Sequence, residues 1–590
     1  MLPPYNARER ASVFGTQDAL ENGIHLGTER RPARLVTAAR VVGILAGTAL
    51  ILPMLSPLIP MDDAAWGPLV SYTPEVANAS TAETIPPPLM PDEPVAFEAI
   101  PDEVTDTPTH PPLALPPTSE DLEDPAVAAR VAVDAVFARQ SKTLAEATAR
   151  YTLHTKRPPP PNYDRWFQFA QEHQCLIDEY EQVHRDFKPF YQLAETHPQF
   201  FQWMIDVESK LLDAAPAEIS VVEIRDGEAF ISGGTAYATW PETFSKFSTL
   251  LPDMTFVING RDEPRVAFNF RSRTAETQAF ERTDMQPFHI EPRPTADFFR
   301  NQDGCFVPME ADGIMRGVND EHSFLLASAK PGYTTDLYPM LSMAKVSPCF
   351  SDILFPTEYY YDRSWWSGKY EHPDDVAWED KKPQIYWRGK STGGKIIGEN
   401  YHHFMRFKLA DLGAGYPDLL DVKLTQVDDL ACGDGCDSDA IAREYNITGD
   451  WAAREDVYSY KYAVDVDGET FSGRFLGLLR SGSLVFKATI FEEYFNGWLK
   501  PFEHYIPVKA DLSDLVQQVK WANENPVEAR LIQLRGLEAA RRLVTDEQSD
   551  CYFSAVLLEW AQLQEIARKA KEVVEEEVVA QVEEVEVGME

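Results

Sequence analysis

A stretch near the C-terminal end of the chain has the residue types of a phosphate-binding loop. Residues 460–468 (YKYAVDVDG) alternate apolar and polar side chains before an Asp-Gly turn, which predicts a strand. Residues 475–482 then predict a short helix, and residues 483–486 predict a second buried strand. Backbone N–H groups at the start of such a helix can bind an anion, and Arg474 would add a fixed positive charge there. The alternative is a structural crossover that binds nothing.

A Gly-rich turn earlier in the chain predicts a second phosphate-binding element. The spacing from Gly389 to Lys395 fits the G-x-x-x-x-G-K pattern of a nucleotide-binding P-loop. The next residue is Ile396, where that motif requires a Ser or Thr to hold Mg²⁺, so we do not expect an NTPase. What remains is a turn after a strand, with Arg388 in it and Arg406 on the following helix, which is suited to a diphosphate.

Asp262 is the candidate general base. It lies in the sequence NGRDEP at residues 259–264, directly after a predicted strand. Sheets of α/β proteins usually carry their catalytic groups at such carboxyl ends. The Asp262 carboxylate could take a proton from a hydroxyl group while Arg261 holds it in orientation. By itself, an aspartate in a turn is more often structural.

The carboxylate and cysteine patterns do not predict a metal site. Asp465 and Asp467 have the D-x-D spacing found in some metal-dependent nucleotide-sugar enzymes, but a strand that ends in an Asp-Gly turn explains them as well. Cys432 and Cys436 have no second close Cys or Cys/His pair, so a local disulfide or free thiols are expected. The six cysteines could form up to three disulfides, with about 15 possible pairings.

Length and charge limit the kind of protein. The 590 residues are enough for roughly two to four domains, and a hydrophobic content of 44% supports large cores. The formal net charge of -40 argues against nucleic acid as a partner, because a phosphate backbone binds a basic surface.

The N-terminal part predicts a single membrane anchor. Residues 1–34 are polar and form the predicted cytoplasmic tail, and residues 35–60 form the predicted transmembrane signal anchor. No charged residue occurs from Val41 to Met61, and about 20 apolar residues suffice to cross a bilayer. Arginines precede the span, so the positive-inside rule places the rest of the chain in the lumen. A cleaved signal peptide is the alternative, but its polar leader would be too long.

A long Pro-rich region follows the predicted span. Residues 61–162 are rich in Pro, Thr, Ser and acidic residues and predict a disordered luminal stem, with an amphipathic helix at 126–150. N-glycosylation sequons begin at Asn78 and Asn446, both on the predicted luminal side.

Folded structure is predicted to begin near Tyr163. Residues 163–215 and 511–567 have helical patterns, and strands are predicted at 219–224, 253–259 and 384–387. The Val- and Glu-rich residues 568–590 predict a solvated acidic tail or a frayed helix.

These stretches together resemble glycosyltransferase family 90, the capsule-associated and protein O-glucosyltransferase family. The strongest match lies at residues 460–508, which include YKYAVDVDGETFSGRF and SGSLVFK. LPDMTFVINGRDEPRV at 251–266 is similar to the family's N-terminal catalytic stretch, and IYWRGKSTGG at 385–394 is similar to its donor loop. The resemblance covers about 165–565 in the same order.

The resemblance implies an α/β fold of the GT-B type, with two Rossmann-like domains facing a cleft. Residues 163–375 would form the N-terminal acceptor-side catalytic domain, and residues 376–567 the C-terminal UDP-sugar-binding domain. It also implies an inverting transferase that needs no metal or other cofactor and uses Asp262 as its base. The positions that match the family's UDP-sugar contacts are Arg388, Gly389, Arg406, Gly468, Glu469, Thr470, Phe471, Ser472, Gly473, Arg474 and Tyr359.

The chain departs from the animal protein O-glucosyltransferases in places. Lys390 stands where those have Ser, the loop before Arg406 is longer, and the chain ends in VGME rather than in an ER-retention signal. The anchor and stem are similar to those of the fungal capsule-type branch, which implies a single-pass type II Golgi membrane protein. We therefore expect transfer of xylose or glucose from a UDP-sugar to a glycan or glycoprotein hydroxyl. The alternatives are an O-glucosyl- or O-xylosyltransferase acting on protein Ser, and an inactive glycan-binding or scaffold homologue.

Overall fold

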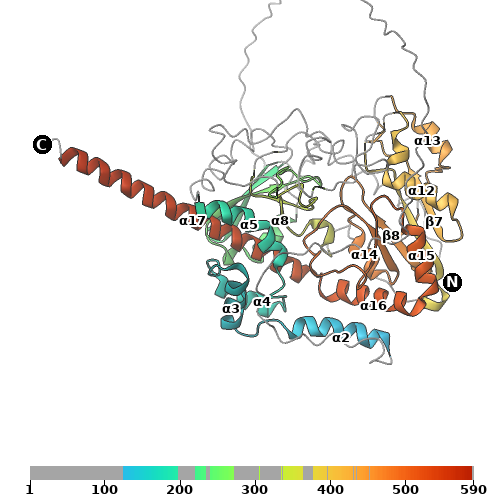
Figure 1. Cartoon of the computed structure of the whole chain (residues 1–590), viewed down its shortest axis with the longest axis horizontal. Coiled ribbons are helices and arrows are strands. Elements are labelled where there is room, and N and C mark those ends of the chain that lie inside the picture. Colours follow the sequence, from blue (N-terminus) through green and yellow to red (C-terminus); the bar gives the residue numbers. More distant parts are fainter. Residues whose placement is uncertain are drawn as a thin grey trace, which may run out of the picture. The chain divides into compact units, whose positions relative to one another are not determined.

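The computed structural model describes most of the chain after residue 123 (Figure 1). The described residues are 124–196, 219–233, 239–271, 305, 334, 337–362, 376–394, 396, 398–429, 431–432, 435–450 and 452–587. The predictions of a cytoplasmic tail, a membrane span and the stem before residue 124 lie outside these ranges. Among the helices of the described ranges, none combines the length and the apolar character needed to cross a bilayer.

The second half of the chain forms a five-stranded sheet in which every strand is parallel. Its strands are β6 (Lys382–Lys390), β7 (Leu420–Gln426), β8 (Tyr460–Val466), β9 (Leu484–Ala488) and β10 (Ile506–Val508). The order across the sheet is β10-β9-β8-β6-β7, so the winding direction reverses between β6 and β8. Ligands of doubly wound sheets bind outside the carboxyl ends of the strands at such a switch point. Both predicted phosphate-binding loops follow these two strands.

Helices connect and cover this parallel sheet. α12 (Met405–Gly415) joins β6 to β7, and α14 (Phe475–Arg480) joins β8 to β9. α15 (Leu515–Glu524) and α16 (Pro526–Arg542) follow β10. β8 and β9 are buried along almost their whole length, which explains why apolar residues dominate both strands.

The first half of the chain forms a mixed sheet, not the fully parallel one that a Rossmann-like domain implies. Its order is β2-β1-β3-β4-β5, where β1 pairs antiparallel with β2 and β3, while β3, β4 and β5 are parallel. Asp226 and Gly227 both have positive φ, which is the backbone of a two-residue hairpin turn and makes β2 return beside β1. The strands are β1 (Ile219–Arg225), β2 (Glu228–Gly233), β3 (Met254–Asn259), β4 (Met340–Ser342) and β5 (Ile353–Leu354).

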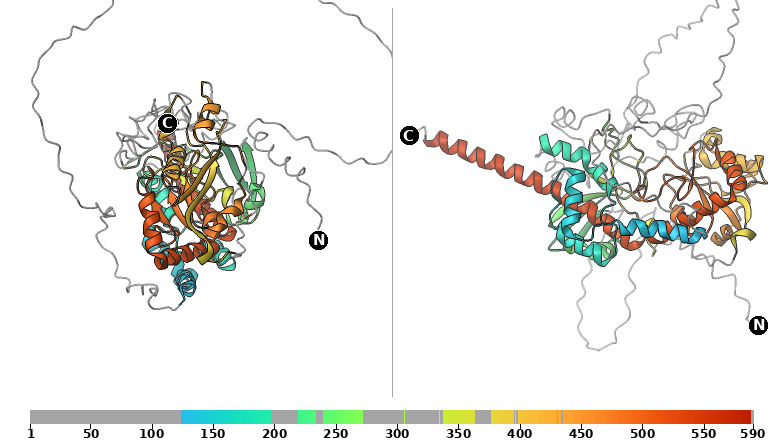
Figure 2. Two further views of the ribbon diagram at one scale, coloured as in Figure 1. Left: turned by 90° about the vertical axis from the view of Figure 1, so that its right-hand side faces the viewer. Right: turned by 60° about the horizontal axis from the view of Figure 1, so that its bottom comes forward.

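Folded structure begins earlier than the predicted start near Tyr163. α2 (Pro125–Ala138) and α3 (Leu144–Thr155) replace the single predicted helix, and the Asp124 side chain caps α2 by accepting from the backbone N–H of Ala126. Figure 2 shows α2 alongside α16. Arg542 of α16 binds Asp134 of α2 at 2.8 Å, so the last part of the predicted stem belongs to the folded body.

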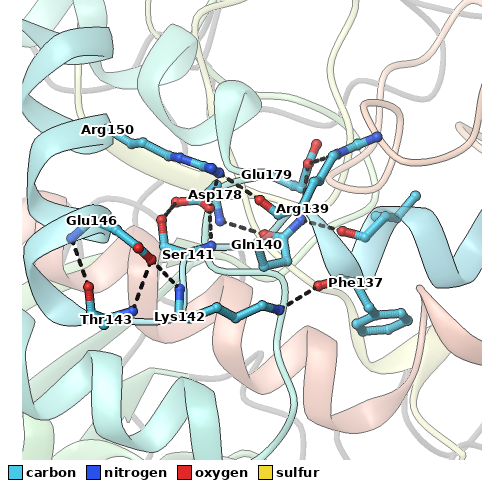
Figure 3. Close-up of polar contacts among 11 residues, drawn as sticks. Phe137, Arg139, Gln140, Ser141, Lys142, Thr143, Glu146, Arg150, Asp178 and Glu179 are labelled. Atoms are coloured by element: carbon cyan, nitrogen blue, oxygen red, sulfur yellow. Dashed lines mark hydrogen bonds and ion pairs between the residues drawn. The ribbon is translucent and has the colours of Figure 1, made fainter. Parts of the chain in front are cut away.

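The turn between α2 and α3 has its own polar network (Figure 3). Ser141 donates its backbone N–H to Asp178 Oδ2 at 2.6 Å, and Arg150 binds the same oxygen at 2.7 Å. Thr143 and Glu146 form a capping box at the start of α3. Asp178 lies between α4 (Tyr163–Glu172) and α5 (Glu181–Thr196), so this turn attaches the first two helices to the next two.

The last helix returns to the first sheet. α17 (Asp546–Val587) carries Cys551, which is disulfide-bonded to Cys175, and Trp560, whose indole N–H donates to the Thr255 carbonyl of β3 at 2.9 Å. The predicted C-terminal domain, residues 376–567, therefore ends too late, because α17 packs with the N-terminal elements. Figure 1 shows the helix continuing through most of the predicted acidic tail. The other disulfides join Cys305 to Cys349 and Cys432 to Cys436.

Gly413 in α12 allows this helix to approach β7 closely. A Cβ added there would lie 2.9 Å from Cβ of Val422, whereas one added at Gly415 of the same helix would meet nothing within 4 Å. Gly413→Ala should therefore lower the free energy of unfolding by about 1–3 kcal/mol through overpacking, as measured by calorimetry. Gly415→Ala is the matched control and should be neutral or stabilising; equal stability of the two variants would contradict this packing.

Candidate active site

Arg406 joins the carboxyl ends of β6 and β8. Its Nε donates to the carbonyl of Asp467 at 2.9 Å, and its Nη1 donates to the carbonyl of Lys390 at 2.9 Å. Gly468 leaves room for this side chain, because a Cβ there would lie 2.8 Å from Arg406 Nη2. Arg406 and Gly468, both predicted to contact the UDP-sugar, therefore lie next to each other at the switch point.

Arg474 brings a second positive charge to the same place. Its Nη1 donates to the carbonyl of Arg388 at 2.8 Å, and the two guanidinium carbons of Arg406 and Arg474 lie 5.7 and 5.5 Å from the ring centre of Trp387. Burial, and then the charge of Arg474, lower the pKa of Arg406 to about 10. Two like charges so close together favour an anion between or beside them.

Two hydrogen-bond donors of this cluster are unused within the described residues. Nη2 of Arg474 and the indole Nε1 of Trp387 are both buried and have no hydrogen-bond partner there. Buried polar groups are nearly always paired, so each points to a missing acceptor. The same residues that concentrate positive charge therefore also lack acceptors, which is the chemistry of an anion site.

The loop at 468–474 closes one side of this cluster. Glu469 Oε1 accepts the backbone N–H of Gly393 at 3.2 Å, which ties the loop to the Gly-rich turn after β6. Burial, with a smaller contribution from Glu263 in the loop after β3, raises the pKa of Glu469 to about 7. The Gly468 N–H donates to the Thr470 carbonyl at 2.8 Å, so the loop turns sharply at its start. α14 after it has only six residues, so the positive charge of the site comes mainly from the arginines.

Asp262 lies just after β3, as predicted, and is partly buried. Burial, and then the charge of Glu263, raise the pKa of its carboxyl group to about 6, although Tyr359, Arg261 and Arg265 act in the opposite direction. The carboxylate is therefore mostly ionised at neutral pH but more basic than an exposed aspartate. Such a group suits general-base catalysis.

Tyr359 lies between Asp262 and the loop at 468–474. Its hydroxyl donates to Asp262 Oδ1 at 3.3 Å, and its ring centre is 5.7 Å from that of Phe471. A Cβ on Gly473 would lie 3.3 Å from Cδ1 of Tyr359, so glycine lets the loop pass close to the ring. The predicted nucleotide contact Tyr359 is thus placed beside the base, where it links the two sheets.

The Arg388 side chain does not join the arginine cluster. Its guanidinium donates to the carbonyl and to Oδ1 of Asp421, each at 2.6 Å, and lies over the ring of Tyr386 at 4.6 Å. Alternate side chains of a strand point to opposite faces, so Arg388 points away from the face that Trp387 occupies. Gly389 accommodates Trp387, because a Cβ there would lie 2.6 Å from the indole ring. Arg388 contributes its carbonyl, which Arg474 binds, rather than its charge.

The two aspartates of the D-x-D pattern have structural partners. Asp465 is fully buried and pairs with Lys487 at 3.3 Å, and Asp467 Oδ2 accepts the backbone N–H of Ile490 at 3.0 Å. Within the described ranges, no group of three or more His, Cys, Asp or Glu residues is arranged to hold a metal ion.

The two glycosylation sequons differ in what the structure describes. Asn446 is exposed, two residues beyond the end of α13 (Ser438–Glu444). Asn78 lies outside the described residues.

Comparisons with known proteins agree with the resemblance in the sequence. Residues 364–588 match the family model "Glycosyl transferase family 90". Protein O-glucosyltransferase 2 from Danio rerio is 29% identical over 197 residues, which cover 33% of this chain and 36% of that protein. Protein O-glucosyltransferase 3 from Homo sapiens is 41% identical over 110 residues, covering 18% and 22%. Protein O-glucosyltransferase 1 from Homo sapiens is 26% identical over 252 residues, covering 39% and 59%. The chain thus spans less than two thirds of the length of each.

Arg474→Gln should weaken the binding of inorganic pyrophosphate by about tenfold or more, since a hydrogen bond to a charged group contributes about 1.5–3 kcal/mol. Isothermal titration calorimetry measures this directly. Arg443→Gln, at an exposed arginine of α13, removes the same charge and is the matched control. Pyrophosphate affinity equal in Arg474→Gln and the unchanged protein would place the anion elsewhere.

Proposed function

We propose that the protein transfers a sugar, glucose or xylose, from a UDP-sugar to an acceptor hydroxyl, and the match of residues 364–588 to the glycosyl transferase family 90 model supports this. One observation supports this most: a pair of buried arginines with an unused donor lies beside the loop at 468–474, and Tyr359 joins that loop to Asp262, a carboxylate of raised pKa. A nucleotide-sugar transferase needs both a cation cluster for the leaving diphosphate and a base for the acceptor.

The arginine pair accounts for the leaving group. When the bond between the sugar and UDP breaks, negative charge develops on the β-phosphate, and preorganised positive groups stabilise that charge most in the transition state. Arg406 and Arg474 are held in place by the carbonyls of Lys390, Asp467 and Arg388, so they do not have to reorganise during the reaction. The diphosphate leaves without needing a proton from a general acid.

Asp262 accounts for activation of the acceptor. It would take the proton of the acceptor hydroxyl as that oxygen attacks C1 of the sugar from the face opposite UDP, which inverts the anomeric configuration. The base works only when ionised. Since its pKa is about 6, transfer should be lost as the pH falls through that value.

The acceptor we propose is a hydroxyl of a glycan or glycoprotein. A second candidate is a Ser hydroxyl of a protein, which the names of the protein O-glucosyltransferase relatives favour. The inactive scaffold remains the non-enzymatic alternative, and it predicts no UDP release with any UDP-sugar.

We further propose that the domain lies in the Golgi lumen, attached to the membrane by the apolar residues from Val41 to Met61 as a type II single span. We also propose that no metal or other cofactor is required, since the arginines supply the charge that a divalent cation supplies in D-x-D enzymes.

Asp262→Asn should reduce transfer by about 100- to 10,000-fold, the usual contribution of a general base. UDP affinity should stay nearly unchanged, because the arginine cluster is intact. The measurements are UDP release with a panel of UDP-sugars and UDP binding by calorimetry. Asp253→Asn, at the opposite end of β3, is the matched control and should keep full activity. Comparable turnover of Asp262→Asn and the unchanged protein would remove Asp262 as the base.

Transfer should persist at its full rate after treatment with EDTA. Lys487 pairs with Asp465 Oδ2, and the backbone N–H of Ile490 donates to Asp467 Oδ2, so each carboxylate has a structural partner on one oxygen, while Oδ1 of each has no hydrogen-bond partner among the described residues. Rates measured with EDTA, with and without added Mn²⁺, test this. An absolute requirement for Mn²⁺ would show that the D-x-D pair binds metal after all.

A further inference from the structure

Three consecutive tyrosines, residues 359–361, each donate a side-chain hydrogen bond to a carboxylate in a different part of the fold. They include the end of a single 3₁₀ turn, η5 (Glu358–Tyr360). The three pairs are Tyr359 with Asp262, Tyr360 with Glu493, and Tyr361 with Asp550. These partners follow β3, follow β9 and lie in α17. One short segment therefore contacts the candidate base, the parallel sheet and the last helix.

Tyr360 is the member of this set whose hydroxyl lies against the backbone of the loop at 468–474. Its hydroxyl has one proton, which it shares between two acceptors, the Glu493 carboxylate and the carbonyl of Ser472, the latter at 3.2 Å. The residue is only 3% exposed. Burial, and then the charge of Glu493, raise the pKa of Tyr360 well above its usual value, so the hydroxyl keeps its proton and remains a donor.

A buried ion cluster holds Glu493 in turn. Glu493 is fully buried, and its carboxylate lies 3.5 Å from Nζ of Lys487, which also pairs with Asp465 at 3.3 Å. The ammonium group lies 3.8 Å from the ring centre of Phe475, the first residue of α14. The cluster thus contacts the strand before the loop and the helix after it. Buried charges of this kind hold one geometry, because removing one partner leaves the other uncompensated.

We propose that Tyr360 is a positioning residue for the sugar donor. Through its hydroxyl it holds the Ser472 carbonyl, and with it the loop at 468–474, in the arrangement in which Arg474 receives the diphosphate. Its neighbour Tyr359 holds Asp262, so one turn sets the donor side and the acceptor side of the site together. The inference rests on the proposed function, because it assigns the loop to donor binding.

Tyr→Phe substitutions at the three positions separate this role from a purely structural one. Tyr360→Phe should weaken UDP binding about three- to tenfold, the value of one net hydrogen bond, and leave the acid limb of the pH–rate profile in place. Tyr359→Phe should move that limb to higher pH. The Tyr359 hydrogen bond lowers the pKa of Asp262, so its removal raises that pKa. Tyr361→Phe, the matched control, removes an equally buried hydroxyl bonded to Asp550 and should change neither quantity.

UDP affinity by calorimetry and pH–rate profiles are the two measurements. A lower UDP affinity in Tyr360→Phe, with control affinity in Tyr361→Phe, supports the inference. UDP affinity in Tyr360→Phe equal to that of the unchanged protein overturns it. A similar loss of affinity in Tyr360→Phe and Tyr361→Phe also overturns it, since that would reflect a general loosening of the fold. If the unchanged protein binds no UDP, the proposed function fails instead.

A second variant carries the test if Tyr360→Phe does not fold. Glu493→Gln keeps an amide oxygen for Tyr360 but removes the charge that the hydroxyl and Lys487 share. It should weaken UDP binding while the acid limb of Asp262 stays in place. UDP affinity equal to that of the unchanged protein would overturn the inference.

Discussion

Two guanidinium groups at the reversal point of the parallel sheet determine how the rest of the site is built. Arg406 lies in the first turn of α12, and Arg474 directly precedes α14. Main-chain carbonyls at the ends of β6 and β8 hold Arg406, and a carbonyl of β6 holds Arg474. Carbonyl dipoles stabilise the charges only in part, since like charges repel and burial disfavours both. The lowered pKa of Arg406 and the unused donor of Arg474 express the same deficit. A diphosphate would supply the missing negative charge and acceptors together.

At the candidate base, burial acts on a negative charge instead of a positive one. Burial raises the pKa of Asp262 and makes it a stronger base. The hydrogen bond from Tyr359 favours the ionised carboxylate and orients it. Tyr359 and Tyr360 are neighbours in one turn but bond to different parts of the site: Tyr359 to Asp262, and Tyr360 to the Ser472 carbonyl. Tyr360 also donates to Glu493, which pairs with Lys487. The base and the loop therefore depend on contacts between residues more than 90 positions apart in sequence.

The local parts of this site were predictable from the sequence. Asp262, Arg406 and the loop at 468–474 follow strands that end in Asn-Gly, Gly-rich or Asp-Gly turns, and such patterns are read within a few residues. The position of the Arg388 side chain was not predictable from the motif, because a strand carries side chains on both faces: Arg388 pairs with Asp421, and Trp387 beside it faces the arginines.

The contacts between distant segments could not be read from the sequence. Glu493 is fully buried, because its carboxylate accepts a hydrogen bond from Tyr360, which lies 133 residues earlier in the chain. The same holds for the docking of α17 on β3 and for the pairing of Cys175 with Cys551, which are separated by 376 residues.

The most direct test of the central claim is the anomeric configuration of the first product, measured by proton NMR during transfer from an α-linked UDP-sugar. An arginine cluster holding the diphosphate on one side and a single base delivering the acceptor from the other predict inversion, and therefore a β-linked product. An α-linked product would contradict this account, because retention requires either attack from the face that UDP leaves or a covalent sugar–enzyme intermediate.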